Sequence, residues 1–231
     1  MTTSSSDRTV SPFASETLAL PTPVTGEEAR AVFGQVTGLV AVTVGFLALG
    51  AYVGRDLNGG LGIAFFVAGF ACLIGLNVAS GRGRQQLSIS LLFGFGLLLG
   101  LALGPVINAY AKADPAAVWQ AAGATGAFIA GLGAIGYATR RDLSAWARTL
   151  FWALLALIVF GTVAILVSIP HADLIYAIAG LVIFGGYTIF DFNRLRRAGI
   201  ADAVPIAASI FLDILNVFLL LLRLLFGNVY N

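Results

Sequence analysis

The chain has 231 residues, of which 59% are hydrophobic and only 10% are charged, and its formal net charge at pH 7 is +2. Soluble domains carry about 25% charged residues, so this composition and a mean hydropathy of +0.95 exclude a soluble globular protein and predict a polytopic membrane protein. The small net charge gives no reason to expect a nucleic-acid partner. The only cysteine is Cys72, which excludes an internal disulfide and a CxxC metal site, and the only histidine is His171, which excludes a histidine-rich metal site.

The N-terminal residues 1–30 are rich in Ser, Thr and Pro and contain no continuous apolar run, which predicts a disordered tail. The tail lacks the basic start and apolar stretch of a secretory signal, so we expect it to stay on the cytoplasmic side. Residues 31–231 contain seven apolar segments that approach the ~20 residues needed to cross the hydrocarbon core. They predict an all-α membrane domain with helices at about 33–53, 61–80, 87–111, 116–138, 149–169, 173–192 and 204–226.

Basic residues are distributed unevenly between the connectors and indicate the orientation. Ten arginines fall in the tail or beside alternate connectors, namely Arg8, Arg30, Arg82, Arg84, Arg140, Arg141, Arg148, Arg194, Arg196 and Arg197. The remaining connectors hold only Arg55 and Lys112. Because basic residues concentrate on the cytoplasmic side, we predict a cytoplasmic N-terminus and, with seven spans, an external C-terminus. The short loops favour a bacterial inner membrane.

Small residues at a spacing of four predict close helix packing, because they let backbones approach each other in lipid. Two such rows are Gly96, Gly100 and Gly104, and Gly123, Ala127 and Gly131. The seventh segment is apolar on nearly all sides, except that Ser209, Asp213 and Asn216 share one face at i, i+4, i+7. That polar stripe needs protein or water beside it, so we expect the seventh helix to be central.

Only two of the eleven acidic residues, Asp191 and Asp213, fall within predicted spans. A charged side chain at mid-membrane costs about 2.5–3.5 kcal/mol even on the lenient insertion scale, and such residues usually face the bundle interior and carry function. The sixth and seventh helices share a short cytoplasmic loop, which places both carboxylates in the same half of the membrane. Asp213 is expected about 13 Å along its helix, deeper than Asp191 unless helix tilt brings the two level.

Two neighbouring carboxylates in a low-dielectric site cannot both ionise easily and therefore titrate as a unit. We expect the pair to share a proton at rest and to lose it as the pH rises, which leaves either repulsion or a site for a cation. Oxygen ligands suit a hard cation such as Ca²⁺, so Asp191 and Asp213 are also a candidate calcium site. No other cofactor is expected.

The neighbours of the two aspartates supply further candidates. Tyr187 and Thr188 lie one turn before Asp191 and either hydrogen-bond to it or simply pack. Asn216, one turn after Asp213, is the better candidate for a hydrogen-bonding neighbour. Arg194 follows Asp191 by three residues and is placed to pair with it at the membrane surface, which is the purely structural interpretation of Asp191.

Five segments resemble one known family, the Bax inhibitor-1 (TMBIM, or YccA-like) family of membrane proteins. They are GLALGPVINAY (100–110), GATGAFIAGL (123–132), TRRDLS (139–144), FDFNRLRR (190–197) and FLDILNVFLLLLRLLFGN (211–228). The resemblance covers about residues 33–228. It implies a seven-helix fold in which the last helix is surrounded by the other six, and proteins that leak calcium in a pH-dependent way and, in eukaryotes, suppress cell death.

The resemblance also implies a role for particular residues. The aspartates that match Asp191 and Asp213 form a hydrogen-bonded pH sensor in the family, and a basic residue on the second helix latches the first of them. Arg82 and Arg84 are the nearest candidates for this latch here. The family often has Asp-Thr where this chain has Asp191-Phe192, so one hydroxyl group near the sensor is missing.

The sequence thus predicts a pH-sensitive cation leak, most simply for calcium, and no enzymatic activity. Intramembrane aspartyl proteases also place aspartates on two adjacent spans, but their Tyr-Asp and Gly-x-Gly-Asp motifs are absent here. A rhomboid-like serine protease is disfavoured because His171 falls in an external loop. The alternative that stays open is a non-conducting regulator that binds membrane proteases or other membrane proteins.

Overall fold

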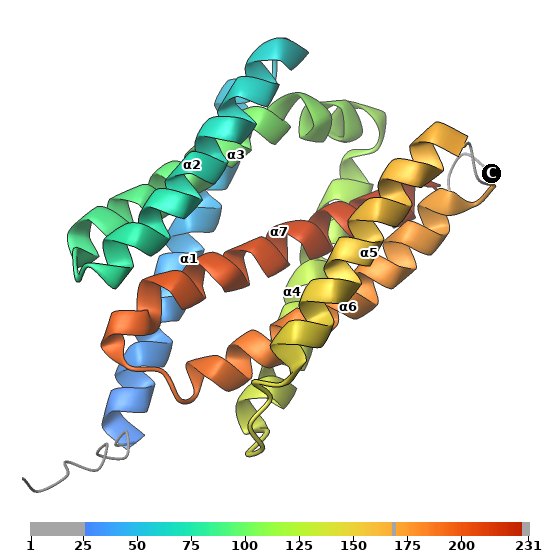
Figure 1. Cartoon of the computed structure of the whole chain (residues 1–231). Coiled ribbons are helices and arrows are strands. Elements are labelled where there is room, and N and C mark those ends of the chain that lie inside the picture. The colour runs from blue at the N-terminus through green and yellow to red at the C-terminus, as the bar shows by residue number, and fades with distance from the viewer. Residues whose placement is uncertain (1–25, 168–169, 228–231) are drawn as a thin grey trace, which may run out of the picture.

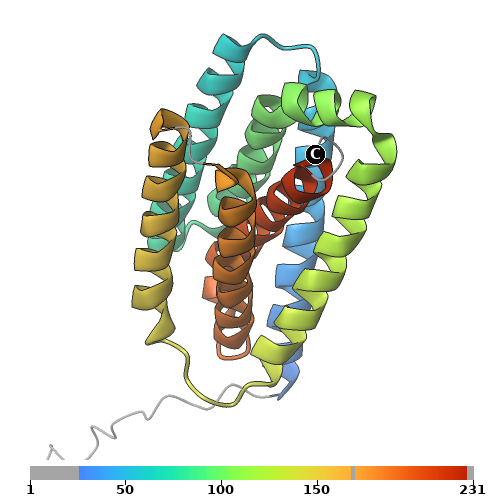
Figure 2. The ribbon, with the colours of Figure 1, turned by 90° about the vertical axis from the view of Figure 1, so that its right-hand side faces the viewer.

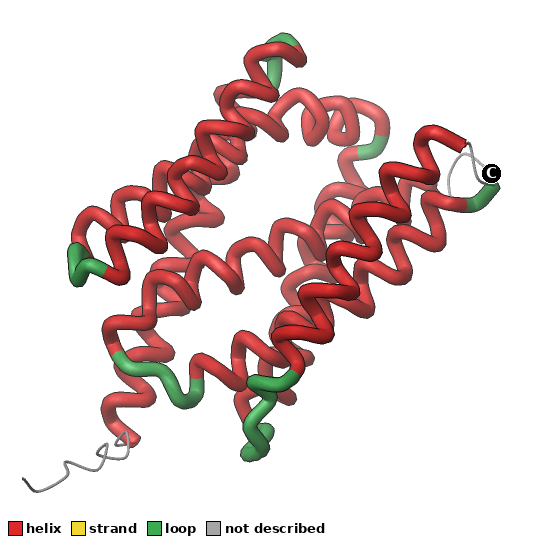
Figure 3. Tube along the Cα trace, viewed as in Figure 1, coloured by secondary structure: helices red, strands yellow, loops and turns green. Residues whose placement is uncertain are grey.

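The structure, a computed structural model, describes residues 26–167 and 170–227, and every regular element in this part of the chain is helical. The helices are α1 (Gly26–Gly54), α2 (Gly59–Gly81), α3 (Gln85–Ala113), α4 (Pro115–Ala138), α5 (Trp146–Val167), α6 (Ala172–Leu195) and α7 (Ala203–Gly227), with a short 3₁₀ turn, η1 (Ile200–Asp202), before α7. All seven α-helices are long and apolar enough to cross a membrane. Short loops join them (Figure 3), and the predicted seven-helix fold is confirmed.

The helix boundaries agree with the predicted ones within three residues except at the start of α1. α1 begins at Gly26 rather than Phe33, so residues 26–30 belong to a helix and not to the predicted tail. Glu27 and Glu28 lie in its first turn, where negative charge interacts favourably with the positive end of the helix macrodipole. The rest of the predicted tail, residues 1–25, lies outside the described residues.

α7 is the central helix and lies between two groups of three. α1 and α2 pack on α3, α4 and α5 pack on α6, and α7 packs against α6, α4 and α1 and, less extensively, against α2 and α3. Figures 1 and 2 show α7 in red, crossing the middle of the molecule. Of its most apolar stretch 56% is buried, against 6% for α5, which packs principally on α6 at the outside. The predicted central position of the last helix is therefore confirmed.

The basic residues gather at one end of the bundle, which we call the arginine-rich end. It comprises the start of α1 and the α2–α3, α4–α5 and α6–α7 loops. In Figure 1 the α2–α3 loop lies at the left and the other three parts lie at the bottom. Its arginines are Arg30, Arg82, Arg84, Arg140, Arg141, Arg148, Arg194, Arg196 and Arg197. At the opposite end, Arg223 of α7 forms an ion pair with Asp173 of α6 and lies over the ring of Tyr176. The C-terminal end of α7 is thus attached to α6.

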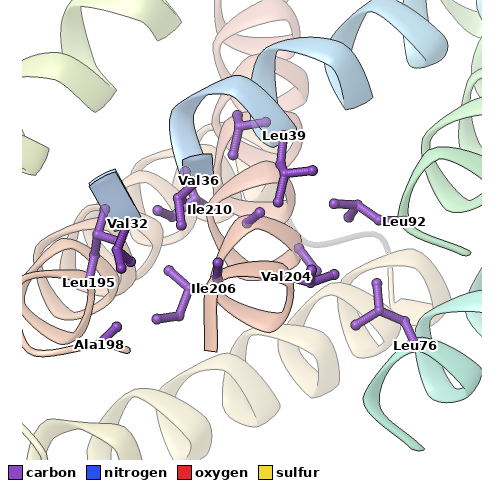
Figure 4. Packing of buried hydrophobic residues seen from close by; sticks show 14 residues of the cluster. Val32, Val36, Leu39, Leu76, Leu92, Leu195, Ala198, Val204, Ile206 and Ile210 are labelled. Carbon is purple, nitrogen blue, oxygen red and sulfur yellow. The ribbon is translucent and has the colours of Figure 1, made fainter. Parts of the chain in front are cut away.

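Apolar packing fixes the first half of α7. Figure 4 shows how side chains from four other helices surround the first turns of α7. They are Val32, Val36 and Leu39 from α1, Leu76 from α2, Leu92 from α3 and Leu195 from α6, and they pack against Val204, Ile206 and Ile210 of α7. All of these side chains are buried. The helix that carries Asp213 is therefore held in one rotational setting close to the arginine-rich end.

The closest helix contact joins α1 and α3 through the first predicted row of small residues. A methyl group at Gly100 would lie 2.9 Å from the Cα atom of Gly50 and nearer still to the carbonyl oxygen of Leu47. Gly96 and Gly104 likewise approach the α1 backbone. Only glycine permits this separation, and the prediction of close packing is confirmed for this row.

The second predicted row does not pack against another helix. Gly123 and Gly131 have no neighbouring atom within 4 Å of where a methyl group would stand, and Ala127 is exposed. α4 instead buries a different face, which includes Thr125 and Ile129. The prediction of packing was wrong here because small residues spaced by four occur on more than one face of α4, and spacing alone does not say which face is buried.

Candidate functional site: a buried carboxylate pair

The two membrane-embedded aspartates come together in the bundle interior. Asp191 lies one turn before the end of α6 and Asp213 near the middle of α7, and their residues are only 1% and 3% exposed. The two carboxylates interact electrostatically. α7 is tilted relative to α6 (Figure 2). Both aspartates are therefore buried inside the bundle, away from lipid.

Asp191 is held by a hydroxyl group from the neighbouring helix. The Oγ atom of Ser209 on α7 donates a hydrogen bond to Oδ2 of Asp191. Ser209 lies one turn before Asp213 on the same face of α7, so a single stripe of this helix presents a donor and then an acid to α6. The stripe was visible in the sequence, but the sequence did not assign Ser209 to Asp191, because the rotation of α7 relative to α6 follows from packing.

Asp213 is less completely satisfied. Its Oδ2 atom is buried and has no hydrogen-bond partner among the described residues, whereas the hydroxyl group of Thr188 lies beside the carboxylate. Buried polar atoms in folded proteins are almost always paired, and an exception calls for an explanation such as an unseen water or ion. A bound proton, which turns the carboxylate into a donor, or a cation would satisfy this oxygen.

The structure places the other predicted neighbours as follows. Thr188 is fully buried and donates to the carbonyl oxygen of Phe184 as well as facing Asp213. Tyr187 is half-buried and interacts electrostatically with both aspartates. Asn216 donates to the carbonyl oxygen of Leu212 at 2.8 Å in its own helix, and within the described residues no hydrogen bond joins it to Asp213. Thr188, rather than Asn216, is thus the predicted neighbour that interacts with Asp213.

The candidate latch arginines differ in their relation to the pair. Arg194 is exposed, and its positive charge acts on Asp191 from the surface of the arginine-rich end. Arg82 and Arg84 lie in the exposed loop between α2 and α3, and among the residues that the structure describes no ion pair links them to Asp191 or Asp213. In this conformation Arg194 is the candidate that bears on the site.

A polar cluster that the sequence did not indicate fixes the end of α6. Asn193 is 1% exposed, and its Nδ2 atom donates to the carbonyl oxygens of Thr139 and Arg141 at 2.8 and 3.1 Å. Its Oδ1 atom accepts a hydrogen bond from Arg197 at 2.8 Å, and Arg197 also forms an ion pair with Asp142 at 2.7 Å. The α4–α5 loop is therefore attached to α6 two residues beyond Asp191, which restrains the part of the helix that carries the carboxylate.

The acidic pair stands apart from other metal-ligating residues. In residues 26–167 and 170–227 no group of three or more His, Cys, Asp or Glu side chains is arranged to hold a metal ion. Ca²⁺ takes six to eight oxygen ligands, so two carboxylates with the hydroxyl groups of Ser209 and Thr188 would need several waters to complete its shell. The residues fit a passing cation better than a resident one.

Comparison with known proteins identifies the family. Residues 29–229 match the model of a family described as inhibitors of apoptosis-promoting Bax1. The chain belongs to the Bax inhibitor-1 family. The match spans all seven helices almost completely, so the resemblance of the sequence segments is confirmed over the whole membrane domain.

Individual relatives come from bacteria and from a virus. The chain is 33% identical over 167 residues to an uncharacterized membrane protein of Vibrio cholerae. This alignment covers 71% of this chain and 70% of the relative. It is 28% identical over 162 residues to a protein of Helicobacter pylori, with 70% of each chain covered. A Golgi anti-apoptotic protein of Vaccinia virus is 33% identical over 145 residues, covering 62% of this chain and 60% of the relative.

Proposed function

We propose that this Bax inhibitor-1 family protein is a pH-sensitive cation leak, with calcium as the permeant ion, and that Asp191 and Asp213 are its proton sensor. The observation that carries the proposal is the buried, unpartnered oxygen of Asp213 beside a second buried carboxylate. A buried charged pair of like sign is unfavourable, and a proton on the pair removes the repulsion and supplies a hydrogen-bond donor.

The gating step follows from the placement of the two acids on different helices. With a proton bound, the pair stays close and α7 remains packed against α6. Once the proton is lost, the two negative charges repel each other, which weakens the α6–α7 contact and opens a path along the polar face of α7 for a cation attracted to the carboxylates. Flux should therefore rise with pH. Ser209 holds Asp191 in place, so Asp213 is the acid whose environment changes.

The experiment compares calcium flux into proteoliposomes that contain a calcium-sensitive dye, measured from pH 5 to pH 8. We expect flux through the wild-type protein to increase with pH, and the Asp213→Asn variant to conduct at the low-pH rate throughout, because asparagine stays neutral. Asp202→Asn is the matched control, since Asp202 is an exposed acid of η1 at the arginine-rich end. If Asp213→Asn conducts with an unchanged pH dependence, the sensor assignment is wrong.

A non-conducting regulator is the second candidate, and the exposed face of α5 favours it. α5 buries only 6% of its most apolar stretch and presents Trp152, Ile165 and Leu166 outward. Such a face is available to another membrane protein, and one viral relative carries the name of an anti-apoptotic protein. Purified protein that shows no calcium flux at any pH, but co-purifies with a stable membrane partner, would favour this function over a leak.

The protein is an integral membrane protein, and we propose that the arginine-rich end faces the cytoplasm of a bacterium. Nine arginines of the described residues lie at that end, in agreement with the positive-inside rule. The C-terminal end of α7 then lies outside, and α6 presents Asp191 near the cytoplasmic surface. Labelling of cysteines introduced into the α4–α5 loop with an impermeant maleimide on intact cells tests this: labelling without lysis would contradict it.

A further inference from the structure

A groove runs along the outside of the bundle between α1 and α4, starting from the arginine-rich end. Its volume is about 520 Å³. It is lined by Arg30 and Phe33 of α1, by Ala130, Gly133, Ala134, Tyr137 and Ala138 of α4, and by Phe192 of α6. Along α4 it extends from Ala130 to Ala138, or about 12 Å toward mid-membrane. The groove is an apolar trough within one leaflet.

The groove exists because α1 and α4 hardly pack on each other. Both helices pack on α7 instead, and the rings of Phe33 and Tyr137 meet across the gap, edge to face at 5.2 Å. The α4 wall consists of small side chains, and Ala130 and Ala134 are exposed. No larger side chain fills the trough, so in a bilayer its occupant must come from outside the described bundle.

Positive charge lies at one end of the groove only. Arg30 lines it at the arginine-rich end. Arg140 and Arg141 follow groove residue Ala138 by two and three positions, and Arg194 follows groove residue Phe192 by two, and all three are exposed. Glu27 and Glu28 of the first turn of α1 lie beyond Arg30, so the basic residues are the charges nearest the membrane interior.

We propose that this groove binds one anionic phospholipid, with an acyl chain in the trough and the phosphate group beside Arg30. An apolar channel of leaflet depth with a guanidinium group at its mouth matches an acyl chain joined to a phosphate, because arginine binds phosphate through paired hydrogen bonds. The floor of the site is Phe192, whose ring lies 3.0 Å from where a methyl group on Gly133 would stand. The bound chain would therefore touch the residue that follows Asp191.

The test is native mass spectrometry of the full-length protein in detergent, titrated with phosphatidylglycerol or with phosphatidylcholine of the same acyl chains. We expect one phosphatidylglycerol molecule to bind at least tenfold more tightly than phosphatidylcholine. Ala134→Trp, which fills the trough, should abolish the preference, whereas Ala127→Trp, exposed on α4 but outside the groove, should keep it. Arg30→Gln should reduce it severalfold and Arg148→Gln should not. Equal binding of both lipids, unaffected by Ala134→Trp, would mean ordinary surrounding lipid and would overturn the proposal.

A second measurement identifies the occupant directly and does not depend on the tryptophan variants folding. The photoreactive amino acid p-benzoylphenylalanine replaces Tyr137, an aromatic residue of similar shape, and the protein is irradiated in phosphatidylglycerol vesicles. A lipid adduct on α4 supports the site, and a cross-link to residues 1–25 of the same chain would show that the chain covers its own groove and overturn it. Neither measurement involves ion flux, so the result is independent of whether the protein conducts.

Discussion

Replacement of Gly100 by alanine should separate α1 from α3. Carbon atoms in ordinary contact lie about 3.5–4.0 Å apart, and the new methyl group would stand 2.9 Å from the Cα atom of Gly50. The two helices must move apart by at least about 0.6 Å. The atoms in the way, the Cα atom of Gly50 and the carbonyl oxygen of Leu47, belong to the backbone and cannot rotate away. Overpacking of this kind destabilises by about 1–3 kcal/mol, which corresponds to a lower melting temperature by roughly 5 °C.

The chain supplies its own reporter for this experiment. Cys72 is the single cysteine, is partly buried on α2, and packs against the cluster of Phe95, Leu99 and Phe211. A fluorogenic maleimide added during a temperature ramp in detergent therefore reports when α2, α3 and α7 separate. Gly45→Ala is the matched control, because nothing lies within 4 Å of the added methyl group, and it should melt at or slightly above the wild-type temperature. If Gly100→Ala melts there too, the close approach of α1 and α3 does not constrain the fold.

Two further changes test the polar cluster at the arginine-rich end. Asn193→Ala removes three hydrogen bonds of 3.1 Å or shorter, and at about 1 kcal/mol each it should destabilise the protein by about 2–3 kcal/mol and speed proteolysis of the α4–α5 loop. The control Asn77→Ala loses one exposed hydrogen bond and should behave as wild type. Equal melting temperatures of the two variants would contradict the role of the cluster. Hydrogen bonds from Ser144 and the charge of Arg197 lower the pKa of Asp142 from 3.8 to about 2, so its contribution to stability is present above about pH 4 and is lost as the pH falls through about 2. The loss of unfolding free energy in Asp142→Asn relative to wild type, measured by tryptophan fluorescence, should thus be constant from pH 5 to pH 8. A loss that becomes smaller between pH 8 and pH 6 would refute this assignment.

Most of the fold could be predicted because a membrane imposes strict requirements on the sequence of each span. Each span needs a long apolar run, and the arginines alternate between ends, so the number and order of helices follow from hydropathy and charge. The start of α1 was misplaced because residues 26–30 are too polar to count as part of a span, although a helix can continue past the lipid into water. Hydropathy locates the part of a helix inside the membrane and not its capping turn.

The site could be predicted in its acids but not in all of its neighbours. Asp191 and Asp213 stand out because buried carboxylates in a membrane are costly, and the shared loop between their helices brings them together. The contact from Ser209 to Asp191 depends on the rotation of α7 about its axis, which the packing of α1, α2, α3 and α6 determines. Asn193 reads as an ordinary polar residue at a helix end, and only the return of the α4–α5 loop over α6 buries it.

The middle position of α7 has a consequence for biosynthesis. A ribosome makes this helix after the other six, so α1–α3 and α4–α6 enter the bilayer before the element that joins them exists. The α1–α3 contact requires neither α7 nor its acid, and the first three helices can associate while synthesis continues. Asp213 reaches the bilayer only when Asp191 and Thr188 are already there to receive it, so chain order shortens the time that this carboxylate spends facing lipid.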